Sequence, residues 1–303
     1  MDADALLPPD VARRAEDVGV SKVTMPTESL FVLAVLAGAF ISLGAVFSTV
    51  VTAGGGMAPG PARLLGGVVF SLGLVLVVVA GAELFTGNAL VAIATASRRV
   101  RVRALLRNWL IVYVGNFVGA LLTTVGVVWS GIYERGDGAV GLRALDIAAA
   151  KTSLAADEAV ILGVFANALV CLAVWLSLSA RSVSDKILAV TFPVAAFVAA
   201  GFEHSIANMY FIPAGLFLRA WAPASFWAAT GTGPGDYATV TWPDFLIGNL
   251  LPVTIGNIVG GAVLVGLVYW FVYRRGRAHD ETVAEPSGDG HRPDAEVGSE
   301  THG

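Results

Sequence analysis

The amino-acid sequence predicts an all-α membrane protein whose six transmembrane helices form two inverted three-helix repeats. Of its 303 residues, 56% are hydrophobic and only 14% are charged, and the mean hydropathy is +0.74. A helix that crosses a bilayer needs about 20 mainly apolar residues. The repeat is predicted by short glycine and asparagine patterns that occur in both halves of the chain. Six stretches are long and apolar enough to span, over about residues 29–52, 64–95, 108–130, 159–179, 187–218 and 246–273.

Residues 1–28 precede the first apolar stretch and are expected on the cytoplasmic side of the membrane. The segment opens with Asp2 and Asp4, so it does not have the form of a secretory signal peptide. Over residues 5–20, apolar side chains are interspersed with charged ones, which favours a short amphipathic helix at the membrane surface with Pro9 near its start. A disordered lead-in is the alternative.

The second and fifth apolar stretches are too long for one straight crossing, and polar residues interrupt each of them. Glycines near both interruptions permit a break in the helix. Ionisable groups at membrane depth usually line a cavity or a pathway. We therefore predict that the second and fifth helices are broken at residues 81–88 and 201–208, where the interrupting polar residues are Glu83, Asn88, Glu203, His204 and Asn208.

Three further segments lie outside the predicted spans. Residues 131–158 are expected to form a mixed-charge segment on the outer side. Residues 215–245 are expected to form an outer loop, whose tryptophans suit the membrane interface. Residues 276–303 are charged and small with no apolar periodicity, which predicts a disordered cytoplasmic tail.

The basic residues predict the orientation of the chain. An even number of spans returns the chain to the side on which it began, so both termini are expected on one side. With that side taken as the cytoplasm, the outer segments hold only five of the 19 lysines and arginines, namely Arg63, Arg135, Arg143, Lys151 and Arg219. This bias follows the positive-inside rule and predicts a multi-pass protein of the cytoplasmic membrane with both termini in the cytoplasm.

Two pairs of short segments recur within the chain. Residues 81–88 and 201–208 share glycine, glutamate and asparagine at the same offsets, and residues 115–119 and 256–260 both read Gly-Asn-x-Val-Gly. The first pair falls in spans two and five, and the second in spans three and six. Because each half has an odd number of spans, the second half is inverted relative to the first. Inverted repeats with interrupted helices point to a site near the membrane midplane.

A break in a membrane helix frees backbone groups that lipid cannot satisfy. We expect side chains at the two breaks to satisfy them. Glu83 and Glu203 are predicted to be structural carboxylates that accept from the freed amides. Asparagine amides both donate and accept, so they are expected to pin the breaks, at Asn88, Asn208, Asn116 and Asn257.

Several classes of function do not fit this sequence. The net charge is −4 and no basic stripe is visible, which argues against nucleic-acid binding. His204 has no cysteine or second histidine at metal-ligand spacing, and Ser205 has no partner acid in an obvious triad. The remaining histidines, His279, His291 and His302, are too scattered for a metal site. We therefore expect no metal, no cofactor and no enzymatic activity.

Three segments carry a resemblance to a known family. Residues 81–88 read Gly-Ala-Glu-Leu-Phe-Thr-Gly-Asn, residues 201–209 read Gly-Phe-Glu-His-Ser-Ile-Ala-Asn-Met, and residues 256–261 read Gly-Asn-Ile-Val-Gly-Gly. These segments resemble signatures of the formate/nitrite transporter family, and the resemblance covers about residues 5–275. It implies a six-span channel domain over residues 29–275 with an aquaporin-like fold, assembled in membrane lipid as a homopentamer with one pore through each protomer.

The resemblance also implies roles for individual residues along the pore. Without it, the leucines and phenylalanines among them would read as ordinary packing, and the lysine as a solvated loop charge. The implied set is the central pair His204 and Thr86, the cytoplasmic constriction of Leu74 and Leu84, the outer constriction of Phe70 and Phe197, Lys151 in the outer vestibule, and Asn167 and Asn257 along the path.

The resemblance implies transport of small monovalent anions of weak acids, formate first and nitrite next. A bare anion is heavily penalised in a narrow apolar passage. A histidine, whose unperturbed pKa is about 6.5, can supply a proton so that the neutral acid crosses instead. Passage of the intact anion beside His204 is the competing scheme. Hydrosulfide, or a neutral solute such as ammonia, water or glycerol, is the alternative substrate.

Overall fold

A computed structural model describes residues 5–276 of the chain. Within this range the fold is all-helical, with no strand. Six helical stretches are long and apolar enough to cross a membrane, which confirms the predicted number of spans. They cover Thr27–Val51, Pro59–Gly81, Val102–Trp129, Ala156–Ser179, Val183–Ala200 and Asp244–Tyr273. The predicted C-terminal tail lies outside the described residues from residue 277 onward.

The two halves of the chain contain corresponding series of helices. The first half consists of α1 (Pro8–Thr24), α2 (Thr27–Val51), α3 (Pro59–Phe70), α4 (Leu72–Val75), η1 (Leu76–Gly81), α5 (Phe85–Asn88), α6 (Val91–Ala96) and α7 (Val102–Trp129). After the short η2 (Ile132–Glu134), the second half consists of α8 (Ala139–Thr152), α9 (Ala156–Ser179), α10 (Val183–Ala200), α11 (Ser205–Trp221), α12 (Ala224–Thr230), η3 (Pro234–Tyr237), η4 (Asp244–Leu250), α13 (Leu251–Ile258), η5 (Val259–Leu267) and α14 (Val268–Tyr273).

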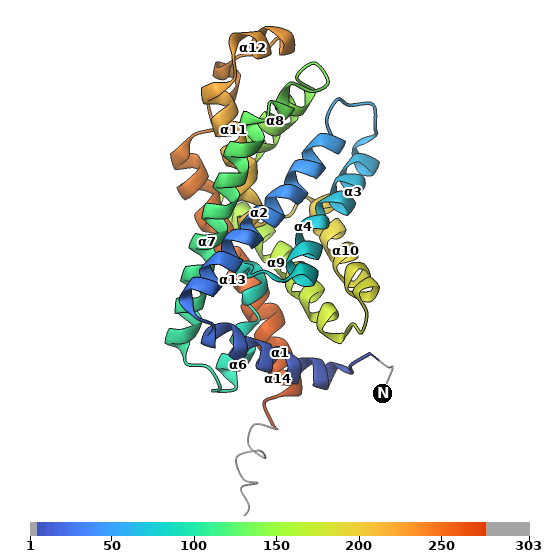
Figure 1. Cartoon of the computed structure of the whole chain (residues 1–303), viewed down its shortest axis with the longest axis vertical. Coiled ribbons are helices and arrows are strands. Elements are labelled where there is room, and N and C mark those ends of the chain that lie inside the picture. Colours follow the sequence, from blue (N-terminus) through green and yellow to red (C-terminus); the bar gives the residue numbers. More distant parts are fainter. Residues whose placement is uncertain (1–4, 277–303) are drawn as a thin grey trace, which may run out of the picture.

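The long helices run roughly along the long axis of the molecule (Figure 1). One end carries α1, α6 and α14, and we call it the α1 face. The opposite end carries α8 and α12, and we call it the α8 face. The first and last described helices therefore meet at the same face, where α1 packs against α6, α9 and α14.

Both predicted helix breaks are present. The second span ends at Gly81 and the fifth is interrupted at Gly201, and both glycines have positive φ angles, of 88° and 77°. Only glycine adopts this left-handed backbone without a steric penalty. The chain then runs extended to Leu84 in the first half and to His204 in the second, before α5 and α11 begin. The breaks therefore place polar backbone groups in the middle of the bundle.

Close approaches of backbones explain the repeated Gly-Asn-x-Val-Gly segments. On α7, a Cβ added to Gly119 would lie 1.9 Å from the carbonyl oxygen of Val35 on α2. On η5, a Cβ added to Gly260 would lie 2.0 Å from the carbonyl oxygen of Val164 on α9. Small residues at such crossings let helices pack closely in a membrane. The glycines of each half thus hold its first and third spans together.

One expectation about the outer segments is wrong, namely that residues 215–245 form a loop. Residues 131–158 carry the expected mixed charges and are largely helical, because α8 occupies much of them and packs against α11. Its buried side chains, Val140, Ala144, Leu145 and Ala148, recur at helical spacing and form an apolar face that the surrounding charges mask in the sequence. Residues 215–245 also contain helix, since α11 continues to Trp221 and is followed by α12.

A buried carboxylate fastens α1 to the rest of the α1 face. Glu16 is fully buried, and one of its oxygens lies 2.9 Å from Nη2 of Arg274, just beyond α14. Its other oxygen accepts a hydrogen bond from Ser97. Arg99 pairs with both Glu16 and Asp17, and its hydrogen bond to Asp17 raises the pKa of the guanidinium above its ordinary value. The cluster ties together three segments that are far apart in the sequence.

We expect Glu16→Gln to lower the free energy of unfolding by about 3 kcal/mol, because removing one partner of a buried ion pair leaves the other charge poorly compensated. The measurement is thermal or denaturant unfolding of the detergent-solubilised protein. Asp10→Asn on the same helix is the control, since Asp10 lies 4.0 Å from Arg13 in an exposed pair, and such pairs contribute little. Equal stability of the two variants would contradict the role of Glu16.

Candidate functional site

The break in the first half is held by Asn116 of α7. Its Oδ1 accepts the backbone N–H of Phe85 at 2.9 Å. Its Nδ2 donates to the carbonyl oxygens of Ala34 and Glu83 at 2.7 and 2.9 Å. One fully buried amide therefore satisfies groups on both sides of the break and joins them to α2.

The break in the second half is held in the same way by Asn257 of α13. Its Oδ1 accepts the backbone N–H of Ser205 at 2.9 Å. Its Nδ2 donates to the carbonyl oxygens of Gly163 and Glu203 at 2.8 and 3.0 Å. Asn167 in turn donates to the carbonyl oxygen of Asn257 at 2.6 Å. The repeated asparagines therefore pin both breaks.

The expectation that Glu83 and Glu203 accept from the freed amides is wrong. Asparagine oxygens accept from the amides of Phe85 and Ser205, as described above, and the amides of the two glutamates donate to backbone carbonyls of α2 and α9. The carboxylates point instead to side-chain donors.

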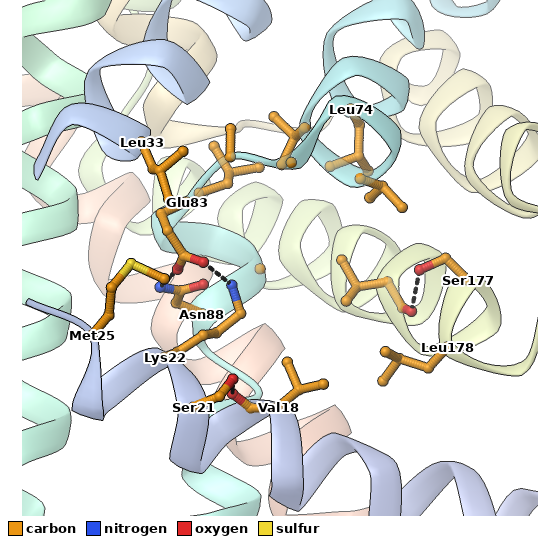
Figure 2. A pocket seen from close by; sticks show the side chains of 17 residues that line it. Val18, Ser21, Lys22, Met25, Leu33, Leu74, Glu83, Asn88, Ser177 and Leu178 are labelled. Atoms are coloured by element: carbon orange, nitrogen blue, oxygen red, sulfur yellow. Dashed lines mark hydrogen bonds and ion pairs between the residues drawn. The ribbon is translucent and has the colours of Figure 1, made fainter. Parts of the chain in front are cut away.

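In the first half, Glu83 belongs to a ring of four side chains. The Nζ of Lys22 lies 2.6 Å from its Oε1, and Nδ2 of Asn88 donates to its Oε2 at 2.8 Å. Asn88 also donates to Oδ1 of Asn108 at 2.9 Å, and Asn108 donates to the carbonyl oxygen of Lys22 at 3.1 Å. Figure 2 shows Lys22 and Asn88 converging on the Glu83 carboxylate.

The second half repeats this ring at the other end of the site. The Nζ of Lys151 lies 2.7 Å from Oε1 of Glu203, and Asn208 donates to its Oε2 at 2.6 Å. Asn208 donates to Oδ1 of Asn249 at 2.7 Å, and Asn249 donates to the carbonyl oxygen of Lys151 at 2.9 Å. Lys151, on α8, is therefore not a solvated loop charge, but a partly buried partner of Glu203.

Sequence reasoning missed Lys22, Asn108 and Asn249. A signal for the two asparagines was present, since Asn108 lies eight positions before Asn116 and Asn249 eight positions before Asn257. Extending the alignment of the repeats toward the N-terminus would have found them. No comparable signal marks Lys22, which lies on α1 outside the aligned segments.

The two halves differ at the centre, where His204 meets Thr86. Nε2 of His204 and Oγ1 of Thr86 are 2.8 Å apart, and both side chains are buried. Nδ1 of His204 accepts the backbone N–H of Ala207 at 3.1 Å and so caps α11. Because that N–H is a donor, Nδ1 carries no proton here, and the neutral ring donates its Nε2 proton to Thr86.

Two cavities approach this centre from opposite ends. The α1-face cavity, of about 360 Å³, is lined by Leu74 and Leu84 as well as by Lys22, Glu83 and Asn88 (Figure 2). The α8-face cavity, of about 430 Å³, reaches His204 and is lined by Phe70 and Phe197. The two cavities share no lining residue. Buried side chains therefore separate them in this conformation.

The residues predicted to form constrictions line the two cavities. The rings of Phe70 and Phe197 meet edge to face with their centroids 5.8 Å apart, and Phe197 stacks on the His204 ring at 5.8 Å. Leu74 and Leu84 are both buried on the α1-face side of the centre. By contrast, Asn167 and Asn257 line neither of these two cavities, and their amides hold the break in the second half.

The chain resembles known proteins in sequence and in structure. Residues 9–271 match the family described as formate/nitrite transporter. The chain belongs to the formate/nitrite transporter family. The family match covers the first five spans in full, the sixth up to residue 271, both helix breaks and most of α1.

Individual members of the family resemble this chain over most of its length. The formate channel FocA of Escherichia coli K12 is 49% identical over 91% of this chain and 97% of its own. The formate channel FocA of Haemophilus influenzae is 40% identical over 87% of this chain and 93% of its own. A solved structure described as a pentameric formate channel with formate bound matches with a TM-score of 0.78 and 44% identity, over 82% of this chain and 97% of its own.

Proposed function

We propose that this protein is a homopentameric channel for small monovalent anions of weak acids, with formate as the first substrate and nitrite as the next. The single observation that supports it best is the His204–Thr86 pair, set between two cavities and behind apolar side chains on each side. The relatives named as formate channels, one of them pentameric, favour formate and the pentamer.

The proposed orientation places the α1 face in the cytoplasm. The described arginines and lysines gather on the segments of that face, as the positive-inside rule requires. The α8 face then opens to the outside, and an incoming anion meets Lys151, Phe70 and Phe197 before it reaches His204.

We further propose that transport is linked to protons through His204. The neutral ring holds one proton, so it becomes a proton donor only after a second proton binds. That proton would go to Nδ1 and would open the bond to the Ala207 N–H. The imidazolium then gives its Nε2 proton to the anion, and the neutral acid passes Leu84 and Leu74 at a lower desolvation cost than the anion. One proton therefore moves with each anion.

A panel of solutes in proteoliposomes tests this proposal. We expect formate and nitrite to enter with about one proton each, and water, glycerol and ammonia to cross no faster than in protein-free liposomes. Hydrosulfide is the third anion of the panel. Faster flux of the neutral solutes than of formate would refute the anion channel, and formate flux without proton uptake would refute the proton link alone.

The structure changes what is expected of Lys151. Its charge offsets the buried Glu203 carboxylate, so Lys151→Gln leaves an uncompensated negative charge beside the path of an anion. We expect formate flux at low concentration to fall about tenfold, which corresponds to about 1.4 kcal/mol in the barrier. In the double variant Lys151→Gln/Glu203→Gln, most of this loss should be recovered, because both charges are gone.

The measurement is initial formate uptake in liposomes with matched amounts of pentamer. Lys22→Gln/Glu83→Gln removes the equivalent charge pair from the ring around Glu83 and is the matched double variant. If the double variant at Lys151 and Glu203 is as slow as Lys151→Gln, the charge of Lys151 acts on the anion directly.

A further inference from the structure

The α8-face cavity is lined by three cationic side chains, and only one of them, Lys151, belongs to the ring around Glu203. Arg143 lies two helical turns before Lys151 on α8, and both line the cavity with Ile147 between them. Arg63, near the start of α3, lines it from the other side. Within residues 5–276, neither arginine forms an ion pair, whereas Lys151 is paired with Glu203.

Arg143 is anchored through its Nε atom, which leaves its two terminal nitrogens available to donate to an anion. Its Nε donates to Oγ1 of Thr52 at 3.2 Å, which anchors the guanidinium to the residue that follows α2. In the described part of the chain, its two terminal nitrogens have no hydrogen-bond partner. A guanidinium presents two parallel N–H donors that match the two oxygens of a carboxylate or of nitrite.

The α1-face cavity has no equivalent. Among the described residues, its charged lining side chains are Lys22 and Glu83, which pair with each other. On the α8 side, Glu158 is a second carboxylate outside any ion pair in the described range, so one positive charge remains in excess. The two mouths, whose rings match closely, therefore differ in electrostatic potential.

We propose that Arg143, assisted by Arg63, forms a capture site for small planar oxyanions in the α8-face cavity, ahead of the Phe70–Phe197 constriction. This inference rests on the proposed function and adds a residue that determines the rate of entry. The site raises the local anion concentration at one mouth only. Its effect is therefore directional, and salt screens it.

The size of the effect follows from Coulomb's law. A unit charge about 7 Å from an anion in water raises the local anion concentration about threefold. At 1 M salt the screening length is about 3 Å, so the enhancement should disappear. Capture at the α8 face therefore lowers the formate concentration at which uptake from that face is half-maximal, and leaves the corresponding concentration at the α1 face unchanged.

The test is initial uptake of radiolabelled formate into spheroplasts and into inside-out vesicles from cells that express the full chain, which detects formate even when a proton moves with it and no net charge crosses. We divide the half-saturating formate concentration measured from the α1 face by that measured from the α8 face, at about 10 mM and about 1 M ionic strength. Arg143→Gln should lower the ratio about threefold at low ionic strength and leave it unchanged at high. Arg143→Lys should retain the wild-type ratio, and Glu158→Gln should raise it.

Arg135→Gln is the matched control, because Arg135 belongs to the same outer segments but does not line the cavity. Size-exclusion chromatography confirms that each variant assembles. An unchanged ratio in Arg143→Gln, or a loss that salt does not remove, overturns the capture site. If the wild-type chain takes up no formate, the proposed function itself fails, which is a different result.

Discussion

In His204→Asn, formate flux at acidic pH is expected to fall at least about tenfold and to lose its dependence on pH. Asparagine is a good N-cap residue, so its side-chain oxygen can accept the Ala207 N–H that Nδ1 accepts in the native chain. The substitution therefore preserves the start of α11 and a polar group toward Thr86. It removes the imidazole, which is the group proposed to bind and release the proton.

Flux should be measured from about pH 5 to about pH 8 in liposomes with the membrane potential clamped, which covers the range of an ordinary histidine. His204→Phe keeps a ring but loses the cap, so its stability must be measured alongside its flux. Thr86→Ser retains the hydroxyl opposite Nε2 and is the control expected to keep the pH profile. If His204→Asn keeps the native rate and profile, proton donation by His204 is excluded.

The spans and the helix breaks could be predicted because their signals are local. An apolar run of membrane length requires a helix whatever the rest of the chain does. Gly81 and Gly201 allow a left-handed backbone, and the polar residues after them mark the breaks. The third helix of each half supplies Asn116 or Asn257, and the sequence repeat placed those residues correctly.

The partners of the glutamates could not be predicted because they are not local. Lys22 reaches Glu83 across 61 positions, and Lys151 reaches Glu203 across 52. Neither lysine lies in an apolar stretch, so the sequence gives no reason to bury it. From the sequence alone, the backbone amides freed at a break could be satisfied equally well by a carboxylate or by an asparagine. The structure decides between the two, because Asn116 on α7 accepts the backbone N–H of Phe85.

The rings around Glu83 and Glu203 match closely, whereas the residues at the centre of the two repeats differ. Glu83 and Glu203 have the same partners in the same order, but His204 takes the position that Leu84 has in the first half. A group that only held the fold would be expected in both halves. We therefore connect the proposed transport with His204 and with the two arginines of the α8-face cavity, and the matching rings with the architecture of the fold.

Gly119→Ala is expected to lower the stability of the protein by about 3 kcal/mol or more, enough to reduce the yield of folded protein severely. The new Cβ would lie 1.9 Å from the carbonyl oxygen of Val35, and neither backbone can rotate away, so α2 and α7 must separate. The measurement is thermal unfolding and gel filtration in detergent.

Gly126→Ala on the same helix is the matched control, since a Cβ there meets no atom within 4 Å of this chain. Both substitutions gain the same helix propensity, about 1 kcal/mol, so the difference between them measures the crossing alone. The repeat-related variant Gly260→Ala should behave like Gly119→Ala, because its Cβ would lie 2.0 Å from the carbonyl oxygen of Val164. Native stability in both crossing variants would show that the two helix pairs separate at little cost, and that the repeated glycines are not what holds the halves together.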